Sequence, residues 1–492
     1  TALITLWCDN NQLTSLDVSK NTALITLWCD NNQLTSLDVS KNTALITLWC
    51  DNNQLTSLDV SKNTALITLW CDNNQLTSLD VSKNTALDIL ACGENQLTNL
   101  NVSRNAALTW LLCEGNQLTN LDVSRNTALT SLRCKDNQLT SLDVSRNTEL
   151  ESLTCYENNL TNLDVSQNAA LESLDCYENN LTSLDVSKNA SLKNLRCDNN
   201  QLISLNVSGC PALTELSCSH NQLTYLDVSR NTALTGLWCD ANKLTSLDVT
   251  KNTKLETLLC SHNRLTSLDV SKNTALEFFL GAWNGYDIIV GPDGTFDLSL
   301  LPSGFDVTKT FNWVCGSVSG NILTVEPGKE SVSYQYTAGD GSALLVYLHV
   351  TVAENPDGDV IMRVYNPGNG KHHYTNGVQE ANTLIAGGWE YEGFGWIAPE
   401  TGNPIYRVYN PGNDNHLYTM DTAERDNLVA GGWVYEGILC YSAGTDGVPL
   451  YRVFNPYVTR NPHHYTDSLE ECEFLKSNGW IVEGISWYGL SK

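Results

Sequence analysis

The sequence predicts a mainly β protein built from three kinds of repetition. A 21-residue period runs without insertion from Thr1 to Asn273 and predicts a solenoid with two parallel β-sheets over residues 1–280. Short alternating segments bounded by Gly, Pro and Asp come next and predict a β-sandwich over residues 281–355. Three units of about 44 residues then predict a pseudo-threefold α+β repeat domain over residues 356–492.

Each 21-residue unit contains two segments in which apolar and polar residues alternate. The first four units are identical, and later units keep the framework L-x-x-L-x-C-x-x-N-x-L-x-x-L-x-V-x-x-N. Period-2 alternation directs Leu6 and Cys8 inward and Trp7 outward. It directs Leu16 and Val18 inward in the same way. Each coil is therefore expected to add one short strand to each of two parallel sheets, at about 4.8 Å per coil.

This framework resembles the leucine-rich repeat signature, in the short bacterial subclass where the motif occurs twice per unit. The amide side chains of Asn11 and Asn21 fall at the turns, where they are expected to bond backbone groups that the bends leave unpaired. After Asn273 the register fails, as expected for a coil that caps the last open core. The solenoid is thus predicted as thirteen full repeats plus a capping coil.

Thirteen of the 17 cysteines occupy the eighth position of the repeat. Parallel side chains on adjacent coils keep their Cβ atoms about 4.8 Å apart, beyond the usual disulfide range of roughly 3.5–4.5 Å. We therefore predict a ladder of free, buried thiols that pack as small apolar residues, with no metal and no cofactor. The ladder consists of Cys8, Cys29, Cys50, Cys71, Cys92, Cys113, Cys134, Cys155, Cys176, Cys197, Cys218, Cys239 and Cys260.

Tryptophan fills the outward seventh position in the first four units. These candidate ligand-binding residues are Trp7, Trp28, Trp49 and Trp70. Exposed apolar strips usually mark contact surfaces, so the column is a candidate platform for sugar rings or a partner protein. The alternative is that duplication copied one tolerated tryptophan four times.

Two columns of charge follow the second half of the repeat. Position 17 is Asp in eleven of thirteen units, and position 20 is Lys or Arg in eleven. An isolated row of carboxylates would repel itself, so the basic column is interpreted as charge balance. Calcium binding by the aspartates is the weaker alternative, because the Gly-rich Asp spacing of calcium solenoids is absent.

The order of the first two parts resembles the layout of internalin-type bacterial surface proteins, in which a leucine-rich solenoid runs into an immunoglobulin-like module. The resemblance implies that residues 281–355 form an immunoglobulin-like sandwich and that the protein is displayed at a bacterial surface. We interpret this sandwich as a spacer and cap rather than as a ligand-binding module.

The C-terminal units share the motif Y-R-x-[YF]-N-P-x…H-x-Y-T-x…E-x…G-W-x-x-E-G. Each unit suggests a strand, a turn, a strand, a short helix and a final strand. In the second unit, Asp421 and Glu424 have capping-box spacing before a helix that Gly431 and Gly432 would close. The motif resembles a bacterial repeat family of unassigned function, found in threes at the ends of secreted and cell-wall proteins.

Equivalent polar and aromatic residues in these units suggest either three shallow glycan sites or a set that defines the fold. As glycan sites, aromatic faces would stack on sugars while polar side chains bond hydroxyls. As fold determinants, Arg would pair with Glu and His would bond the backbone. We interpret most of them as structural and leave one polar residue per unit to bind; a central three-His zinc site is a weaker alternative. The candidates are Asn366, His372, Asn410, His416, Asn455 and His463.

Charge and motif content exclude several functions. The net charge of −27 disfavours nucleic acid and anionic membranes as partners. No apolar run approaches the roughly 18 residues of a membrane helix, so no membrane insertion is expected. Nucleophile elbows, zinc-protease helices and phosphate loops are absent from the sequence, so the protein is not expected to be an enzyme. Residues 274–492 carry 26 acidic and 10 basic residues, which favours neutral or cationic glycans over anionic polymers.

The leading functional hypothesis is a secreted or cell-surface bacterial binding protein of adhesin type. Its solenoid would recognise a protein or glycan ligand, and its C-terminal module would attach to glycan or cell wall. The alternative is a structural scaffold with no ligand of its own, which self-associates through the first repeat because Thr1 begins the array without a cap.

Overall fold

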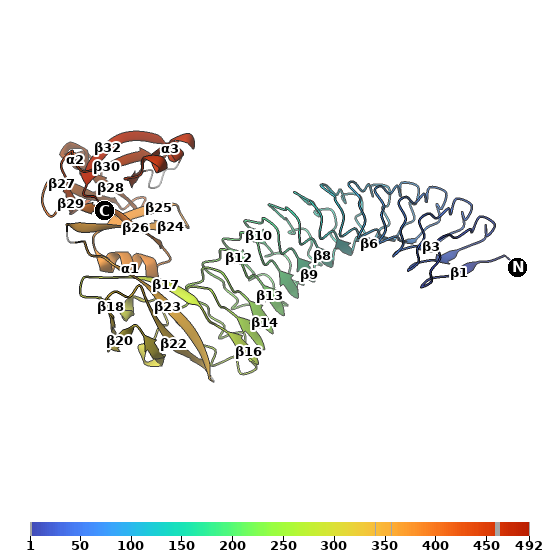
Figure 1. The fold of residues 1–492 in the computed structure, drawn as a ribbon, viewed down its shortest axis with the longest axis horizontal. Helices are drawn as coiled ribbons and strands as arrows, with labels where there is room; N and C mark the ends of the chain where they lie inside the picture. The colour runs from blue at the N-terminus through green and yellow to red at the C-terminus, as the bar shows by residue number, and fades with distance from the viewer. Residues whose placement is uncertain (1, 340, 356, 458–462, 492) are drawn as a thin grey trace. The chain divides into compact units, whose positions relative to one another are not determined.

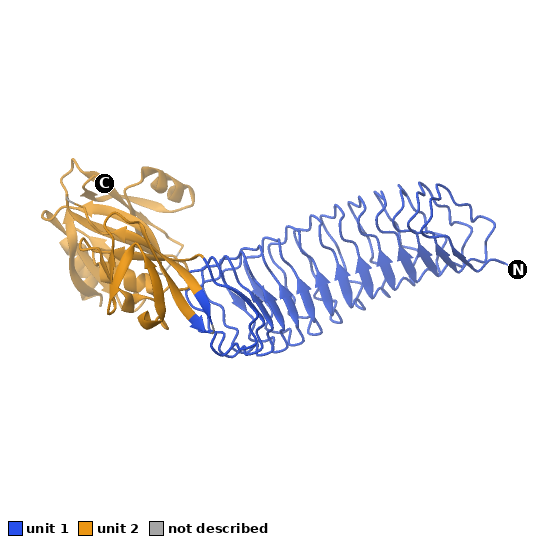
Figure 2. Cartoon of the chain, turned by 60° about the horizontal axis from the view of Figure 1, so that its bottom comes forward, with its two compact units in different colours: residues 1–264, 268–282, 338–343 blue, residues 265–267, 283–337, 344–492 orange. Residues whose placement is uncertain are grey.

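The computed structural model describes residues 2–339, 341–355, 357–457 and 463–491. The chain forms two compact units, which are coloured separately in Figure 2. The first comprises residues 1–264, 268–282 and 338–343, and the second comprises residues 265–267, 283–337 and 344–492. Among the described residues, no helix has the length and apolar character needed to span a bilayer.

The first unit is a solenoid in which each coil adds one three-residue strand to a parallel sheet of 14 strands (Figure 1). Neighbouring strands pair at a shift of one repeat, so Leu6 lies beside Leu27 and Trp7 lies beside Trp28. The strands are β1 (Thr5–Trp7), β2 (Thr26–Trp28), β3 (Thr47–Trp49), β4 (Thr68–Trp70), β5 (Ile89–Ala91), β6 (Trp110–Leu112), β7 (Ser131–Arg133), β8 (Ser152–Thr154), β9 (Ser173–Asp175), β11 (Asn194–Arg196), β13 (Glu215–Ser217), β14 (Gly236–Trp238), β15 (Thr257–Leu259) and β16 (Phe278–Leu280).

The predicted inward and outward directions are confirmed. Leu27 and Cys29 are fully buried, whereas Trp28 between them reaches the surface. All 17 cysteines are free thiols, and those of the ladder are buried except Cys8 in the first coil. Burial raises the thiol pKa along the ladder, for example at Cys155, so these sulfurs remain protonated and chemically inert.

Two asparagine columns join successive coils, as the turn positions predict. Asn32 Nδ2 donates to the Cys8 carbonyl at 2.9 Å, and its Oδ1 accepts from the Leu13 amide at 3.0 Å. In the second column, Asn42 Nδ2 donates to the Val18 carbonyl at 3.0 Å, but its buried Oδ1 has no partner among the described residues. The first column is therefore the more fully bonded of the two.

The second parallel sheet is much smaller than the alternation predicts. Only β10 (Leu184–Asp185) and β12 (Leu205–Asn206) pair there. The turn at position 17 is common to paired and unpaired coils, since Asp38 accepts from the Ser40 amide at 2.9 Å and Asp185 of β10 accepts from the Ser187 amide at 2.9 Å. Gly209 explains the exception, because any Cβ at this position would collide with the backbone of Ser187 in the preceding coil. The missing side chain lets these two coils approach closely.

A column of left-handed backbone runs along the solenoid at position 10 of the repeat. In all thirteen coils the residue there has φ between 48° and 60°. Gly115 is the single glycine in this column, and Asn fills it in the first four coils. The remaining coils place Asn, Asp, Glu, His or Ala in a conformation that glycine adopts most easily.

The second of the two compact units of the chain begins with two small sheets. One has the strand order β17-β23-β22-β19 and the other the order β18-β21-β20, and two 3₁₀ turns lie between them in sequence. The immunoglobulin-like topology expected for residues 281–355 stays a prediction. The elements are β17 (Asn284–Val290), β18 (Thr295–Asp297), η1 (Leu298–Leu300), η2 (Val307–Lys309), β19 (Thr310–Val314), β20 (Gly316–Ser319), β21 (Ile322–Val325), β22 (Ser331–Gly339) and β23 (Ser342–Val352).

The C-terminal module repeats one arrangement three times, with a three-stranded antiparallel sheet and a helix in each unit. The expected order of strand, strand, helix and strand is present. The elements are β24 (Asp359–Asn366), β25 (Lys371–Thr375), α1 (Val378–Ala386) and β26 (Glu390–Ala398); β27 (Asn403–Asn410), β28 (Asn415–Thr419), α2 (Thr422–Ala430) and β29 (Val434–Ser442); and β30 (Val448–Phe454), β31 (His463–Thr466), α3 (Leu469–Ser477) and β32 (Ile481–Gly489).

The capping box predicted for α2 is only half formed. Asp421 accepts from the Ala423 amide at 2.7 Å, as an N-cap should. The Asp421 amide itself donates to Thr419 Oγ1, while Glu424 bonds Arg452 of the next unit. Glu424 is therefore drawn away from its own helix by a charged partner.

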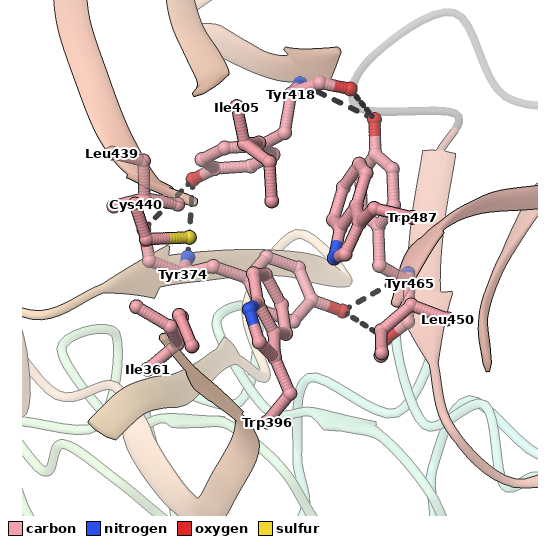
Figure 3. Packing of buried hydrophobic residues seen from close by; sticks show 11 residues of the cluster. Ile361, Tyr374, Trp396, Ile405, Tyr418, Leu439, Cys440, Leu450, Tyr465 and Trp487 are labelled. Carbon is pink, nitrogen blue, oxygen red and sulfur yellow. Dashed lines mark hydrogen bonds between the residues drawn. The ribbon is translucent and has the colours of Figure 1, made fainter. Parts of the chain in front are cut away.

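A ring of three tyrosines joins the units of the module at their common core (Figure 3). Tyr374 donates its hydroxyl to the Tyr465 carbonyl at 2.8 Å and accepts from the Tyr465 amide at 3.1 Å. Tyr418 bonds Tyr374 in the same double manner, and Tyr465 bonds Tyr418. Each unit therefore satisfies the buried backbone of another, and the ring is closed.

Candidate functional site

The four tryptophans predicted as a platform form a stacked column on the outer face of the 14-stranded sheet. Ring centroids lie 5.1 Å apart for Trp7 and Trp28, and 4.5 Å apart for Trp28 and Trp49. The last pair, Trp49 and Trp70, is 5.7 Å apart and tilted by 41°. Trp7 is 65% exposed, while the other three are partly covered by their neighbours. The indoles therefore order one another before any ligand arrives.

An isoleucine column widens this apolar surface at position 4 of the repeat. Ile4 is 53% exposed, and Ile25, Ile46 and Ile67 are between 37% and 41% exposed. Isolated exposed apolar residues are ordinary, but a column of exposed isoleucines in the same four coils as the tryptophans adds apolar surface to this end of the solenoid.

Aspartates at position 9 border the tryptophan column. Asn31 Nδ2 donates to Asp30 Oδ2 at 2.8 Å, and the backbone amide of Gly93 donates to Asp72 Oδ1 at 2.7 Å. Burial raises the pKa of Asp72 to about 7 and also raises the pKa of Asp51. Asp72 is consequently only partly ionised near neutral pH.

A second aromatic cluster, missed by the sequence reasoning, lies in the middle coils. Tyr156 and Tyr177 stack with ring centroids 4.1 Å apart. Lys135 Nζ lies 5.0 Å from the Tyr156 ring, and the Arg196 guanidinium lies 4.6 Å from the Tyr177 ring. Both rings are thus covered by a cation at one end. The signal was available in the sequence, because position 9 changes from acidic to Lys and Tyr in these coils.

The aspartates at position 17 are occupied by the backbone rather than arranged around an ion. Asp59, for example, accepts from the Ser61 amide at 2.9 Å, and this bond lowers its pKa. The described part of the chain contains no group of three His, Cys, Asp or Glu residues placed to hold a metal ion.

In the C-terminal module, one arginine per unit binds a glutamate on the last strand of the same unit. Arg363 Nε lies 3.0 Å from Glu392, and Arg407 Nε lies 2.9 Å from Glu436. Each glutamate precedes a glycine with positive φ, such as Gly437 at 112°, where the strand register shifts. The motif E-G therefore marks a bulge that turns the carboxylate toward the arginine.

Each of these arginines also reaches a glutamate on the helix of another unit. Arg407 NH1 lies 3.0 Å from Glu380 of the first unit, and Arg452 NH1 lies 3.2 Å from Glu424 of the second. The third pair closes the circle between Arg363 and Glu471 at 3.5 Å. The sequence predicts that Arg pairs with Glu in this module. It does not predict that each arginine also contacts a glutamate of another repeat unit.

The candidate histidines bond carboxylates rather than the backbone. His372 Nε2 lies 3.1 Å from Glu392, and His416 Nε2 lies 3.2 Å from Glu436. His463 occupies the same place beside Glu483 at 3.5 Å. Burial lowers the pKa of His416 to about 3, so this ring is neutral at physiological pH.

The candidate histidines lie beside other histidines. The His372 ring lies beside His464, with centroids 4.4 Å apart, and the His416 ring lies beside His373 at 4.6 Å. In the described residues, none of these histidines belongs to a group of three or more placed to hold a metal ion.

The candidate asparagines form turns after the first strand of each unit. Asn366 Oδ1 accepts from the Gly368 amide at 2.9 Å, and Asn410 Oδ1 accepts from the Gly412 amide at 2.8 Å. Asn455 makes the equivalent bond to the Tyr457 amide. The side-chain oxygens of these asparagines therefore already accept a hydrogen bond within the N-P turn of the motif.

Three of the six C-terminal candidates line one cavity of about 340 Å³ between the first two units, namely Asn366, His372 and His416. The sequence reasoning did not name the neighbouring His373, Glu380 or Lys371, which share this cavity. Lys371 Nζ lies 2.8 Å from Asp414 of the second unit. Asn410, Asn455 and His463 lie outside this lining.

The fold and the ladder both have a counterpart among solved structures. The functional domain of InlJ from Listeria monocytogenes, described as including a cysteine ladder, is 33% identical in sequence. The match covers 71% of this chain and 81% of that domain, with a TM-score of 0.64. This chain belongs to the internalin-like leucine-rich repeat proteins. The internalin-like chain also resembles the internalin InlF from Listeria monocytogenes at 23% identity, covering 56% of this chain and 86% of that one, with a TM-score of 0.53, which shows the shared fold.

The C-terminal module of this internalin-like protein has its own family match. Residues 360–490 match a domain of unknown function, DUF5648. This agrees with the triplicated family of unassigned function that its motif resembles. Comparison with curated protein sequences gives no match.

Proposed function

We propose that this chain is a secreted or surface-displayed bacterial binding protein whose solenoid binds a protein or glycan partner on the outer face of the 14-stranded sheet. The stacked column of Trp7, Trp28, Trp49 and Trp70 is the observation that carries this proposal. Solenoids commonly present extended binding surfaces of this kind, and tryptophan is enriched among residues that dominate binding energy.

The preorganised stack favours a binding role over passive copying of one residue. Each inner indole is held between two others, so little side-chain freedom remains to be lost when a partner binds. The adjoining isoleucine column supplies further apolar area, and the aspartate border supplies polar contacts at the rim. This combination of an apolar centre and a polar rim is typical of protein interfaces.

The test replaces Trp28 and Trp49 together with threonine and measures binding to protein and glycan arrays. We expect the affinity for any array partner of the full chain to fall by at least about tenfold. A matched control replaces Lys41 and Lys62, which lie at position 20 of the same coils, and it should leave binding unchanged. Equal binding by both double variants would show that the tryptophans do not contribute to binding and are only copies of one tolerated residue.

For the C-terminal module we propose attachment to glycan or cell wall, with the cavity of Asn366, His372 and His416 as one candidate region. Polar groups of opposite charge and the Trp389 side chain line this cavity, which suits a hydroxylated ligand. Binding of the full chain to peptidoglycan and glycan arrays tests the attachment. No binding at high micromolar concentration would remove it.

The competing proposal is a structural scaffold that self-associates through its first repeat and has no ligand of its own. Removing residues 1–84, which hold four identical repeats, separates the two ideas. Unchanged partner binding together with lost self-association, measured by sedimentation, would favour the scaffold. If the full chain is monomeric and the shortened chain no longer binds the partner, the result would favour recognition of a ligand by the solenoid.

A further inference from the structure

A cleft of about 380 Å³ lies between the second and third units of the C-terminal module. Its lining comes from the end of β28, the start of α2 and the bulge of β32. The lining residues are Tyr418, Thr419, Met420, Asp421, Glu424, Arg452, Glu483, Gly484, Ile485 and Ser486.

Pseudo-threefold symmetry supplies two reference sites for this cleft. In the first unit, the helix glutamate Glu380 contacts His373 at 3.2 Å, is bonded by Thr375, and pairs with Arg407. In the third unit, Glu471 has the same three partners, namely His464 at 3.1 Å, Thr466 and Arg363. Both carboxylates are therefore surrounded by donors.

The second unit breaks this pattern at one position. Leu417 stands where the other units have His373 and His464, and it is buried. Glu424 is consequently bonded by Arg452 alone among the described residues, with both contacts at 3.2 Å. An ionised carboxylate offers about four acceptor positions, so Glu424 keeps acceptor capacity that its counterparts have filled. Its carboxylate lines the cleft.

The charges around this open acceptor favour a cation. Asp421, Glu424 and Glu483 face the cleft against the single positive charge of Arg452. The excess of two negative charges matches the wider module, where residues 360–490 hold 15 acidic and 7 basic residues. Two of the carboxylates are already used, since Asp421 caps α2 and Glu483 binds Arg452. Glu424 is therefore the group best placed to accept from a ligand.

The remaining lining fits a small sugar ring. The hydroxyl of Ser486 can bond a sugar hydroxyl, and the half-exposed side chain of Ile485 offers an apolar wall to C–H groups. A few convergent polar groups beside an apolar wall are typical of small-ligand sites, and about 380 Å³ lies at the small end of their range.

We propose that this cleft binds one amino-sugar unit of a glycan, whose protonated amine donates from the cleft to the acceptor capacity that Glu424 keeps because Leu417 supplies no donor. The proposal deepens the glycan attachment proposed for this module and rests on it. The ammonium group supplies both the missing donor and the missing positive charge. An N-acetylated sugar supplies neither the charge nor the same number of donors, so the cleft should distinguish the two forms.

The experiment uses the full chain and titrates it with a glucosamine tetramer, its fully N-acetylated counterpart and trilysine, followed by calorimetry. We expect the glucosamine tetramer to bind at least about tenfold more tightly than the other two probes. Glu424→Gln and Leu417→His should each weaken that binding by about tenfold or more. Leu417→His restores the residue of the other units, so it should fill the acceptor without disturbing the fold. Glu470→Gln removes an equal charge at an exposed position of α3 and should bind normally.

The outcomes separate this cleft from the wider glycan proposal. Two results would overturn the proposal for this cleft and leave glycan attachment standing. One is equal affinity for the N-acetylated tetramer and the glucosamine tetramer. The other is glucosamine binding that neither Glu424→Gln nor Leu417→His changes. Equal affinity for trilysine would overturn the preference for a sugar. Absence of binding to every sugar probe and to the glycan arrays would remove both proposals.

Discussion

Translation relates the repeats of the solenoid, whereas rotation relates the units of the C-terminal module, and the two regions use a repeated residue differently. In the solenoid a residue meets its own copy in the next coil, as Trp28 meets Trp49. In the module equivalent residues meet around one axis, as the three core tyrosines do. A substitution in the solenoid therefore disturbs two neighbours, while a substitution at the axis disturbs every unit.

This contrast explains where each region can vary. The outer face of the solenoid changes from Trp to Arg, Thr and Asp at one position without loss of register. The module keeps its three core tyrosines identical and varies beside them, since Leu417 stands where the other units have His373 and His464. New binding properties are thus expected along columns in the solenoid and between units in the module.

The largest expected effect concerns the two asparagine columns of the solenoid. Asn137→Ala removes an Oδ1 that accepts from the Leu118 amide and an Nδ2 that donates to three carbonyls. Asn147→Ala removes only donor bonds, because its Oδ1 is unpartnered in the described structure. We expect unfolding free energies lower by about 4 and about 2 kcal/mol respectively. Urea denaturation followed by circular dichroism measures both, and equal losses would contradict the asymmetry.

The next effect concerns the rotational axis. Tyr418→Phe removes the hydroxyl that donates to the Tyr374 carbonyl and accepts from the Tyr374 amide. Both backbone groups would stay buried without a partner, so we expect a loss of about 2 kcal/mol in unfolding free energy. Thermal denaturation measures the loss. Tyr457→Phe serves as the control because Tyr457 is 78% exposed, and it should change stability by less than about 0.5 kcal/mol.

A pH dependence follows from the helix glutamates. The hydrogen bond with His464, opposed by burial, lowers the pKa of Glu471 to about 2 from 4.5. A depressed folded-state pKa stabilises the protein above pH 4.5, and that stability is lost as the pH falls toward 2. After allowance for solvent screening at this partly exposed side chain, we expect about 1 kcal/mol. Glu471→Gln should flatten the stability profile across this range, and an unchanged profile would count against the bond.

The smallest effect concerns the cysteine ladder. Cys155→Ala removes one buried sulfur, which should cost about 1 kcal/mol in unfolding free energy. Thiol counting checks the chemistry of the ladder directly. Under denaturing, non-reducing conditions all 17 cysteines should react, because all are free. Few should react in the folded protein, and fewer than about ten free thiols after denaturation would reveal disulfides.

The features that the sequence predicts correctly are mostly those that depend on the pattern within one repeat. The inward direction of Leu6 and Cys8, the role of Asn11 and the helix closed by Gly431 all follow from neighbours within one repeat. These features depend on short-range geometry, which a 21-residue pattern displays directly.

The features that escaped prediction depend on contacts between repeats. The partner of Glu424 lies 28 residues away, so capping-box spacing suggested a bond within the helix instead. The second sheet is limited to β10 and β12, the two coils that the missing side chain of Gly209 lets approach closely, and no pattern within one repeat displays that contact. The pairing of His373 with Glu380 had a visible signal, since both types recur in the first and third units, but only the fold shows that they touch.

The left-handed column of the solenoid has a conformational cost that differs from coil to coil. Asn adopts this conformation readily, whereas Glu, His and Ala pay roughly 1 kcal/mol each. The coils with Asn or Gly at this position therefore hold the least strained versions of the turn, and coils such as those of Glu94 and Ala241 store energy in their backbone. Since each coil contacts only its neighbours, this stored energy is additive and local. Within the interior of the array, opening of individual turns under load or heat should begin in the coils that place Glu, His or Ala at this position.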